Sequence, residues 1–474
     1  MNRMDRPDRR LRPIGLATAL SAVLLLLQGC AAPSAAPGGS PPSGPTVPER
    51  WQHSPASTPS ASNPPAPAEP PPAAEADPTL VALLARAEAA NRDLARAALR
   101  LTQAQQQARL GALRLTPTAG ANASLARPVE GGGTGSATTR SLGTSLGVSY
   151  EADLWGRLAA QRRGDEAQVR AAQTEGPTAR LLMRQQVRDS YWQFAAAEQQ
   201  RALALQQQAL NRELLDATRL RVREGVLLPI EIDRAAATLQ QAEVRLGDLQ
   251  AEAARQRLRL ALLLDEPGPG PALGDARLPT GLDEPVRPGG DPAAILERRP
   301  DVQRARAQVD AALARLQSSE AQRYPTLSFT ASVGTQGTTV RDWLDRPLAT
   351  LAGNLVVPLV DWRRLDLQRD LARSELDLAA LALRETVAQA LTEIESAWLD
   401  GQALRQQLAA NATRLREAEA AERLAELRLS VGAIARADVL QATNARLEAE
   451  QGRLQVLLRL ALNRTQLVRA LAQE

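Results

Sequence analysis

The hydrophobic positions of this chain change their spacing at two places that lie about 208 residues apart. Between 297 and 323, apolar residues recur every three or four positions, as on one face of a helix. After Pro325, apolar residues alternate one by one with Ser and Thr, as in a strand. The same change occurs between Arg92 and Leu125. At each place the pattern predicts a long helix that leads directly into a strand with one apolar face and one small polar face.

This recurrence indicates an internal duplication that starts at Pro78. Four pairs of matching segments keep the same order at offsets of 208 or 207 residues: Asn91–Leu94 with Arg299–Val302, Thr116–Thr118 with Tyr324–Thr326, Trp155 with Trp362, and Gly225 with Gly432. Such a constant offset is the signature of a tandem repeat. Each half then reads helix, strand, loop, strand, very long helix, turn and helix.

The duplication predicts the boundaries of the domains. The first repeat spans 78–264 and the second spans 293–474, with a Gly/Pro-rich equatorial linker at 265–292 between them. The predicted strands lie at about 117–127 and 141–153 in the first repeat, and at about 325–335 and 348–360 in the second.

The polar face of these strands is nearly all Ser, Thr and Gly, which suits a wet lumen, so the strands are typical of a transmembrane β-barrel. A soluble, half-buried sheet shows the same alternation and is the alternative. Four strands cannot close a barrel, because open edges are not tolerated in lipid. Two copies would give eight strands with a filled interior, and three would give twelve with an open bore.

The helices that follow the strands are very long. Leu365–Leu429 contains no proline and would span roughly 100 Å at 1.5 Å per residue. The matching helix of the first repeat, Leu158–Arg223, contains Gly176-Pro177, where we expect a kink or a break.

The N-terminus carries a targeting segment. Five arginines between Arg3 and Arg12 precede the apolar stretch Ile14–Leu27, which is too short to span a bilayer. The segment ends in Leu27-Gln-Gly-Cys30, which resembles the lipobox of bacterial lipoproteins. We therefore expect a signal peptide at 1–29, a lipid on Cys30 that anchors the chain to the outer membrane, and an extended, disordered Pro-rich tether over 30–77.

Composition excludes several classes of function. The formal net charge is only +4 and aromatic residues make up 2%, without the basic patch and interleaved aromatics of a nucleic-acid-binding protein. The only histidine, His53, lies in the tether, and Cys30 is the only cysteine. With no histidine in the predicted folded part, a Ser-His-Asp triad or a His-based metal site is ruled out there, and the sequence contains no metal-ligand cluster or phosphate-binding loop. We therefore predict neither an enzyme nor a cofactor.

The motifs together resemble the outer-membrane factor family of TolC-like channels, and most closely its lipoprotein branch, which includes OprM and NodT. The matching motifs are Glu151–Arg157, Glu297–Asp301, Tyr324–Ser328 and the two glycine turns. The resemblance implies an α+β membrane protein: a homotrimer whose twelve-stranded outer-membrane β-barrel, with four strands from each chain, continues into a long α-helical barrel in the periplasm. It also implies docking to a periplasmic adaptor protein and an inner-membrane efflux pump of the RND type.

The turns after the longest helices, at Gly225 and Gly432, are the expected tips of this helical barrel and the place of its gate. The candidate gate residues follow them: Glu231, Asp233, Arg436, Asp438 and Gln441. In one interpretation the glycines end helices and the acids suit the dipole of the next helix. In the other, Glu231 and Asp438 form charged rings around the pore, with Arg436 paired to Glu231 to hold the tips closed.

Two other functions remain open from the sequence. A non-conducting, lipid-anchored coiled-coil scaffold of the periplasm would explain the tether and the helices, but not the strands. An outer-membrane conduit for protein secretion of type I is a variant of the channel hypothesis. An envelope hydrolase is disfavoured, since the only histidine, His53, lies in the tether and leaves the folded part without a Ser-His-Asp triad.

Overall fold

The computed structural model describes residues 47–48, 51, 77–126, 141–279, 281–282, 291–337 and 347–473. All of them belong to one unit of the chain, 45–474. The predicted signal peptide, Cys30 and most of the tether lie outside these residues. The tether was expected to be disordered throughout, and this is wrong at Val47 and Trp51, which are half-buried against the helices.

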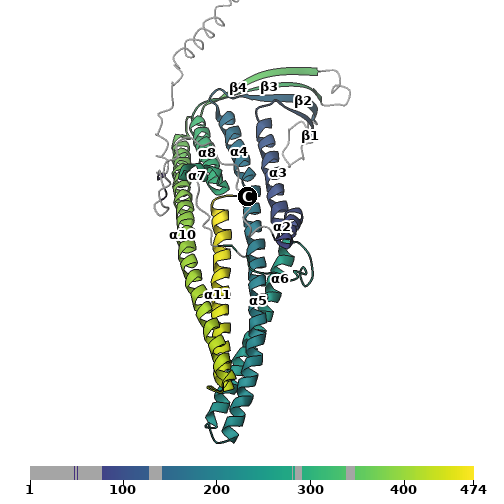
Figure 1. Cartoon of the computed structure of the whole chain (residues 1–474). Helices are drawn as coiled ribbons and strands as arrows, with labels where there is room; N and C mark the ends of the chain where they lie inside the picture. Colours follow the sequence, from purple (N-terminus) through teal and green to yellow (C-terminus); the bar gives the residue numbers. More distant parts are fainter. Residues whose placement is uncertain are drawn as a thin grey trace, which may run out of the picture. The chain divides into compact units, whose positions relative to one another are not determined.

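Four strands form one antiparallel sheet at one end of the long helices (Figure 1). They are β1 (Thr118–Ala126), β2 (Ser141–Ala152), β3 (Thr326–Gly337) and β4 (Pro347–Val356), and their order in the sheet is β1-β2-β3-β4. The two repeats therefore join between β2 and β3. Within the chain, the outer edges of β1 and β4 pair with no described strand.

The register of the sheet places apolar residues opposite apolar residues. Ala121 lies opposite Leu146, which lies opposite Val333 on the next strand. Large apolar side chains of the sheet are exposed, up to 83% for Leu351. On the other face Ser and Thr pair, as where the Thr118 hydroxyl lies 2.7 Å from that of Ser149. The sheet thus keeps one apolar and one polar face.

The strand β4 ends at Val356, although alternation predicted a strand as far as 360. Pro358 is the physical reason, because proline has no N–H to donate to a neighbouring strand. The chain turns instead, with the Leu359 N–H donating to the Val357 carbonyl at 2.9 Å.

The helices continue away from the sheet in two successive rows. The helices of the first repeat are α2 (Pro78–Ala90), α3 (Arg92–Leu113), α4 (Arg157–Gln173), α5 (Glu175–Arg223) and α6 (Ile230–Leu263). Those of the second are α7 (Pro292–Arg298), α8 (Pro300–Ala321), α10 (Trp362–Ser430) and α11 (Arg436–Ala470). Next to the sheet the neighbours run α3-α4-α8-α10, and further away they run α6-α5-α11-α10 (Figure 1).

The expected break in the first long helix lies at Thr174, between α4 and α5. Pro177 has no N–H for the carbonyl of residue 173, so one turn of the helix loses a backbone bond. Two threonine hydroxyls donate to backbone carbonyls there, from Thr174 to Ala171 and from Thr178 to Thr174, both at 2.7 Å. The matching helix α10 is continuous over 69 residues.

The motif Glu151–Arg157 makes the turn from strand to helix. The Asp153 carboxylate accepts the N–H groups of Leu158 and Ala159 at 3.0 and 2.7 Å and so caps α4. Arg157 pairs with Glu151 at 2.6 Å. Gly156 between them has a φ of 71°, a conformation that favours glycine.

The core of the helical part lies midway between the sheet and the far ends of α5 and α10. Its aromatic residues are Tyr191, Trp192 and Phe194 of α5. The described part of the equatorial linker crosses α5 and α6, and its Leu273 and Leu278 are buried in this core. No helix among the described residues is long and apolar enough to cross a membrane.

A buried arginine ties the start of α8 to α10 and α11. The Arg299 guanidinium donates to the Ala470 carbonyl at 2.7 Å and to the carboxylates of Asp301 and Glu393 at 2.8 and 2.9 Å. Burial acts to raise the pKa of Asp301, but the bonds and charge of Arg299 outweigh it and lower that pKa. Arg469 also pairs with Glu393, so the carboxylate joins two cations. The Glu297–Asp301 motif thus fixes the C-terminal end of the second repeat.

Two glycines of the sheet allow a test of the packing between β2 and β3, where the two repeats meet. A Cβ at Gly334 would lie 2.6 Å from the Thr144 carbonyl across β2 and β3, whereas one at Gly120 meets nothing within 4 Å. We expect Gly334→Ala to destabilise the sheet by about 1–3 kcal/mol, since the backbones must move apart. Gly120→Ala is the matched control and should change the melting temperature little. Equal melting temperatures for the two variants would contradict this packing.

Candidate functional site

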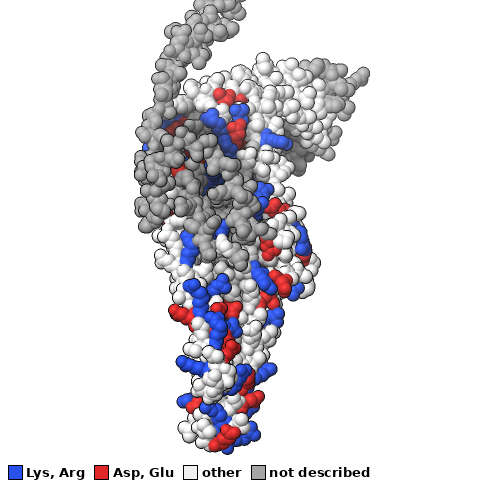
Figure 2. Space-filling model, in the orientation of Figure 1, with Lys and Arg blue, Asp and Glu red and all other residues white. Residues whose placement is uncertain are grey.

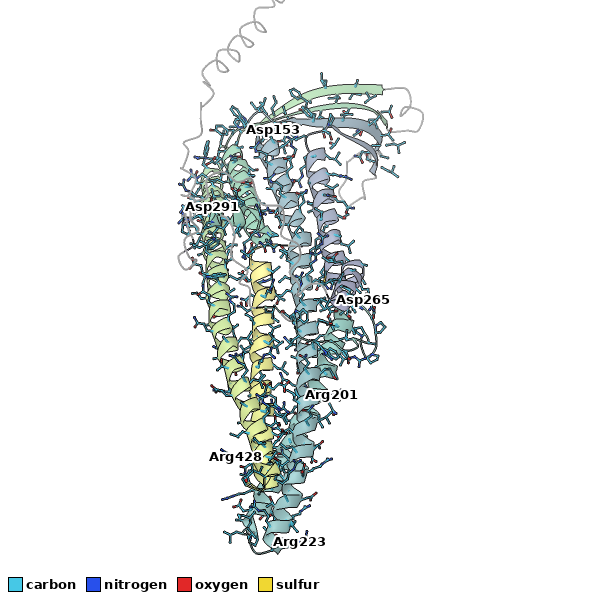
Figure 3. The ribbon with its side chains drawn as sticks, viewed as in Figure 1. Asp153, Arg201, Arg223, Asp265, Asp291 and Arg428 are labelled. Atoms are coloured by element: carbon cyan, nitrogen blue, oxygen red, sulfur yellow. The ribbon has the colours of Figure 1, made fainter. Side chains whose placement is uncertain are left out.

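The helices α5 and α6 form one helical hairpin, and α10 and α11 form a second. Both hairpins end in turns of the same geometry. Gly225 and Gly432 have φ angles of 74° and 72°. In the first turn, Gly225 N–H donates to Val222 O at 3.0 Å and Val226 N–H to Arg221 O at 2.9 Å, which is a Schellman motif. Gly432 and Ala433 make the same two bonds to Leu429 and Arg428. Figure 3 shows these ends, marked by Arg223 and Arg428, far from Asp153 beside the sheet.

Each predicted acid of the first turn lies at the start of α6. The Glu231 carboxylate pairs with Arg234 of the same helix at 2.7 Å. Asp233 is exposed. Both stand in the first turn, where negative charge suits the helix dipole.

Arg436 pairs with a residue that the sequence did not suggest. Its Nε donates to Glu213 Oε1 at 3.0 Å, so the expected pair with Glu231 is wrong within the chain. The reason is the order of the helices: α11 lies against α5, which carries Glu213, whereas α6 lies on the far side of α5. The Arg436–Glu213 pair therefore joins the start of α11 to α5, at a point ten residues before the end of that helix at Arg223.

Asp438 has a local role at the start of α11. Its Oδ2 accepts the Ala435 N–H at 2.9 Å, while its own N–H donates to the Ala435 carbonyl at 3.0 Å. This carboxylate caps the helix. The side chain is still exposed, as is that of Gln441, three residues on and on the same side of the helix. Asp438 therefore caps the helix and still presents its negative charge at the surface of the tip.

Several apolar residues are exposed at the tips. Val226 and Leu228 are 60% and 70% exposed in the first turn, and Val431 is 73% exposed in the second. Both charge signs are interspersed along the helices that lead to the tips (Figure 2). The tips thus offer apolar contact area beside charged residues, a surface suited to a protein partner.

An aromatic cluster that sequence analysis missed lies where the helices meet the sheet. Trp155 stacks on Tyr324 with ring centroids 4.8 Å apart, and its Nε1 donates to the Pro325 carbonyl at 2.8 Å. In the other repeat, the Arg323 guanidinium lies 5.5 Å from the ring of Trp362. Trp155 and Trp362 match across the duplication, and that match was the available signal. Such rings suit the boundary between a membrane and water.

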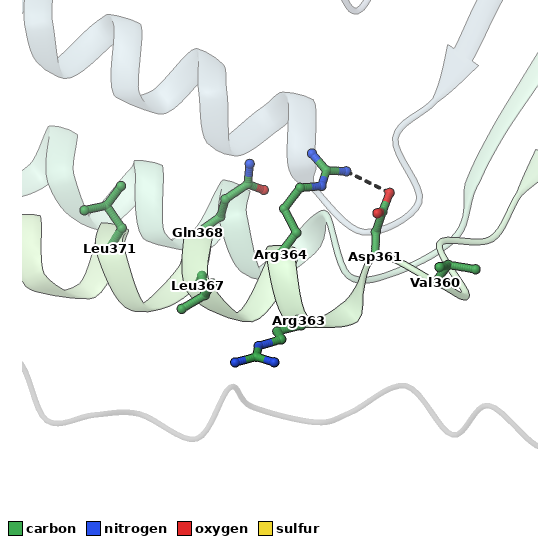
Figure 4. Close-up of a pocket in the computed structure, with 7 residues that line it drawn as sticks. All are labelled: Val360, Asp361, Arg363, Arg364, Leu367, Gln368 and Leu371. Carbon is green, nitrogen blue, oxygen red and sulfur yellow. Dashed lines mark hydrogen bonds and ion pairs between the residues drawn. The ribbon is translucent and has the colours of Figure 1, made fainter.

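A shallow groove runs along the first turns of α10 (Figure 4). Its lining residues are Val360, Asp361, Arg363, Arg364, Leu367, Gln368 and Leu371. Arg364 pairs with Asp361 at 3.0 Å, and Leu367 and Leu371 are exposed. Its chemistry is that of a contact surface. Among the described residues no group of three His, Cys, Asp or Glu side chains is placed to hold a metal ion.

Comparison with known proteins identifies the family. The model of the family described as outer membrane efflux protein matches residues 83–266 and 292–473, once in each repeat. The pyoverdine export outer membrane protein OpmQ of Pseudomonas aeruginosa is 27% identical over 426 residues, 88% of this chain and 89% of that protein. The probable efflux pump outer membrane protein TtgC of Pseudomonas putida is 27% identical over 377 residues, 75% of each chain.

Solved structures share the fold. A crystal structure of CusC superposes with a TM-score of 0.77 at 21% identity, over 93% of this chain and 99% of that one. The open state of the MtrE outer membrane channel of Neisseria gonorrhoeae gives a TM-score of 0.74 at 25% identity, over 84% and 89%. The chain belongs to the outer membrane efflux protein family: it is a channel component of an efflux system, located in the outer membrane and extending into the periplasm.

Proposed function

We propose that this chain conducts substrates as a homotrimer whose twelve strands form one barrel. The supporting observation is the incomplete sheet: the outer edges of β1 and β4 pair with no described strand, and apolar side chains on one face are exposed. Because a sheet edge is not tolerated in lipid, β4 of one copy must pair with β1 of the next. Three four-stranded copies would close a barrel with an open bore, whereas two copies would close a barrel whose interior is filled by side chains.

The helical part would form the periplasmic conduit in the same way. Within one chain α6 and α10 are the outer helices of the row near the tips. Both expose leucines, including Leu258 and Leu262 on α6 and Leu424 and Leu427 on α10. Packing α10 of one copy against α6 of the next would bury these side chains and close a tube.

We assign the tips to docking of a periplasmic adaptor protein that links the channel to an inner-membrane pump of the RND type. The exposed Val226, Leu228 and Val431 support contact with another protein there. The relatives named above serve pyoverdine export and an efflux pump, which favours a small-molecule efflux system over a type I protein-secretion conduit. We further propose that the chain has no catalytic role and needs no cofactor.

We place the gate at the tips, with Asp438 and Arg436 as its central residues. Asp438 is exposed, and threefold repetition would make a ring of negative charge, to which Glu231, Asp233 and the amide of Gln441 would add. Arg436 pairs with Glu213 and so holds the tip of α11 to α5. Opening requires the hairpins to separate, and that pair opposes it.

The gate is tested by single-channel conductance in planar bilayers, where the native protein should conduct. Arg436→Ala breaks the pair with Glu213, so we expect a higher conductance or a longer open time. Asp438→Asn removes the charge but keeps an oxygen that can accept the Ala435 N–H, and it should raise conductance as well. Glu252→Gln on α6, within the helical part, is the control and should leave conductance unchanged.

The contrast between two substitutions at Asp438 separates gate from cap. Asp438→Ala also removes the cap, which costs about 0.5–2 kcal/mol and would fray the first turn of α11 in hydrogen exchange. If only Asp438→Ala alters conductance, Asp438 acts as a cap and not as a charge. If neither Arg436→Ala nor Asp438→Asn changes conductance, the gate does not lie here.

We propose that Cys30 carries the lipid that anchors the chain to the outer membrane. The support is the sequence Leu27-Gln-Gly-Cys30 at the end of a short apolar segment. Mass spectrometry of the N-terminal peptide should show cleavage before Cys30 and an acyl-bearing cysteine. Cys30→Ser should lack both, whereas Gln28→Ala should keep them. An unmodified Cys30 in the native protein would exclude the anchor.

A further inference from the structure

Two residues of the Pro-rich segment before α2 lie on the folded helices. Val47 contacts the cluster made by Leu296, Val302, Val387 and Ala390. Trp51 contacts the neighbouring cluster made by Ile295, Ile394, Ala397, Trp398, Leu467, Ala470 and Leu471. Both clusters belong to the second repeat, on α7, α8, α10 and α11.

The equivalent surface of the first repeat is covered in another way. We call the surface formed by Ile394, Trp398, Leu467 and Leu471 the wall. Its residues match residues of the first repeat at an offset of 207: Val187 with Ile394, Tyr191 with Trp398, Leu260 with Leu467, and Leu264 with Leu471. In the first repeat the matching residues pack against Leu80 and Leu83 of α2, which are 1% and 2% exposed.

In the second repeat, the helix that corresponds to α2 begins later. At the offset of 208 that relates α3 to α8, a copy of α2 would begin at residue 286, whereas α7 begins at Pro292. The equivalents of Leu80 and Leu83 would fall before or at Asp291, which is the N-cap and not part of the helix. α7 therefore begins after the positions whose counterparts in α2 cover the matching residues of the first repeat.

We propose that residues 47–51 are a strap that replaces the missing turns of α7 and fixes the starting point of the N-terminal tether. Trp51 takes the place that α2 fills in the first repeat and completes the core of the second. The cluster against which it packs includes Ala470, whose carbonyl accepts from Arg299. By excluding water from that end of α11, the strap strengthens the ionic contacts of Arg299 and Glu393.

The strap sets the reach of a lipid anchor, and this part of the inference rests on the proposed lipidation of Cys30. Val47 packs against the cluster that includes Val387 of α10, and Trp51 packs against the cluster that includes Ile394, seven residues further along α10 from the sheet. Val387 lies 25 residues from the start of α10 at Trp362, about 38 Å along the helix. Seventeen residues from Cys30 to Val47 span at most about 56–61 Å, which is enough to reach the membrane.

Hydrogen exchange in the detergent-solubilised full chain tests the strap without reference to the lipid. Trp51→Ala should speed exchange about tenfold or more in α7 (292–298) and at the end of α11 (465–471), since both lose a packed ring. The matching end of α6 (258–264) is an internal control and should not change. Trp51→Phe, which keeps an aromatic ring, should restore most of the protection.

Two results would overturn the strap. Unchanged exchange in α7 and α11 would mean that Trp51 rests on a surface that is stable without it. Faster exchange of both repeats to the same extent would mean general destabilisation, since the first repeat has its own cover. Both results are independent of lipidation, channel closure and transport.

Deletions test the reach of the anchor. Removing 35–44 leaves six residues between Cys30 and Val47, which span at most about 23–25 Å, less than the roughly 38 Å required, so we expect a several-fold loss of membrane-inserted protein. Removing 56–65, ten residues on the other side of the strap, should have little effect. Adding Val47→Asp and Trp51→Ala should rescue the first deletion, because the tether then starts near Asp77. Equal effects of the two deletions would exclude the strap as the starting point, and failure of lipidation itself would show as an unmodified Cys30.

Discussion

Unpaired backbone groups at the edges of the sheet constrain everything else in this protein. The strands β1 and β4 each leave one edge open. The apolar face of the sheet is exposed, as at Leu351, whose side chain is 83% exposed. In water such an edge invites aggregation, and in lipid it is not tolerated at all. Pairing with further copies satisfies the edges, and a closed ring of copies turns the polar face inward. Family membership agrees with this requirement and decides against a non-conducting scaffold.

The duplication gives the two halves the same plan but not the same details. Both hairpins end in glycine turns of the same geometry, and a matched tryptophan stands at the start of α10 and two residues before the start of α4. They differ at Thr174, where only the first long helix is interrupted, and at α7, which is shorter than α2. Differences between the halves are therefore informative. One is explained by Pro177, and the other is offset by Val47 and Trp51.

Much of this fold follows from periodic patterns, and the parts that do not follow depend on packing. Alternation around Phe329 predicted the strands. Pro177 predicted a break in the long helix, which the structure shows three residues earlier, at Thr174. The partner of Arg436 was beyond such reasoning, because Glu213 is 223 residues away and becomes adjacent only when α11 packs on α5. Trp51 gave no signal either, since a single aromatic residue in a Pro/Ser-rich segment has no period.

The repeat symmetry also specifies how copies should pair, which allows the most direct test. The pair Val148–Ala331 joins β2 to β3, and its equivalent at offsets of 207 and 208 joins Leu355 of one copy to Ala123 of the next. A chain carrying Ala123→Cys and Leu355→Cys should oxidise to covalent trimers on denaturing gels, while Ala119→Cys with Leu355→Cys should not. Disulfide-linked dimers as the final product, or no linkage between copies, would contradict closure of the barrel by three chains.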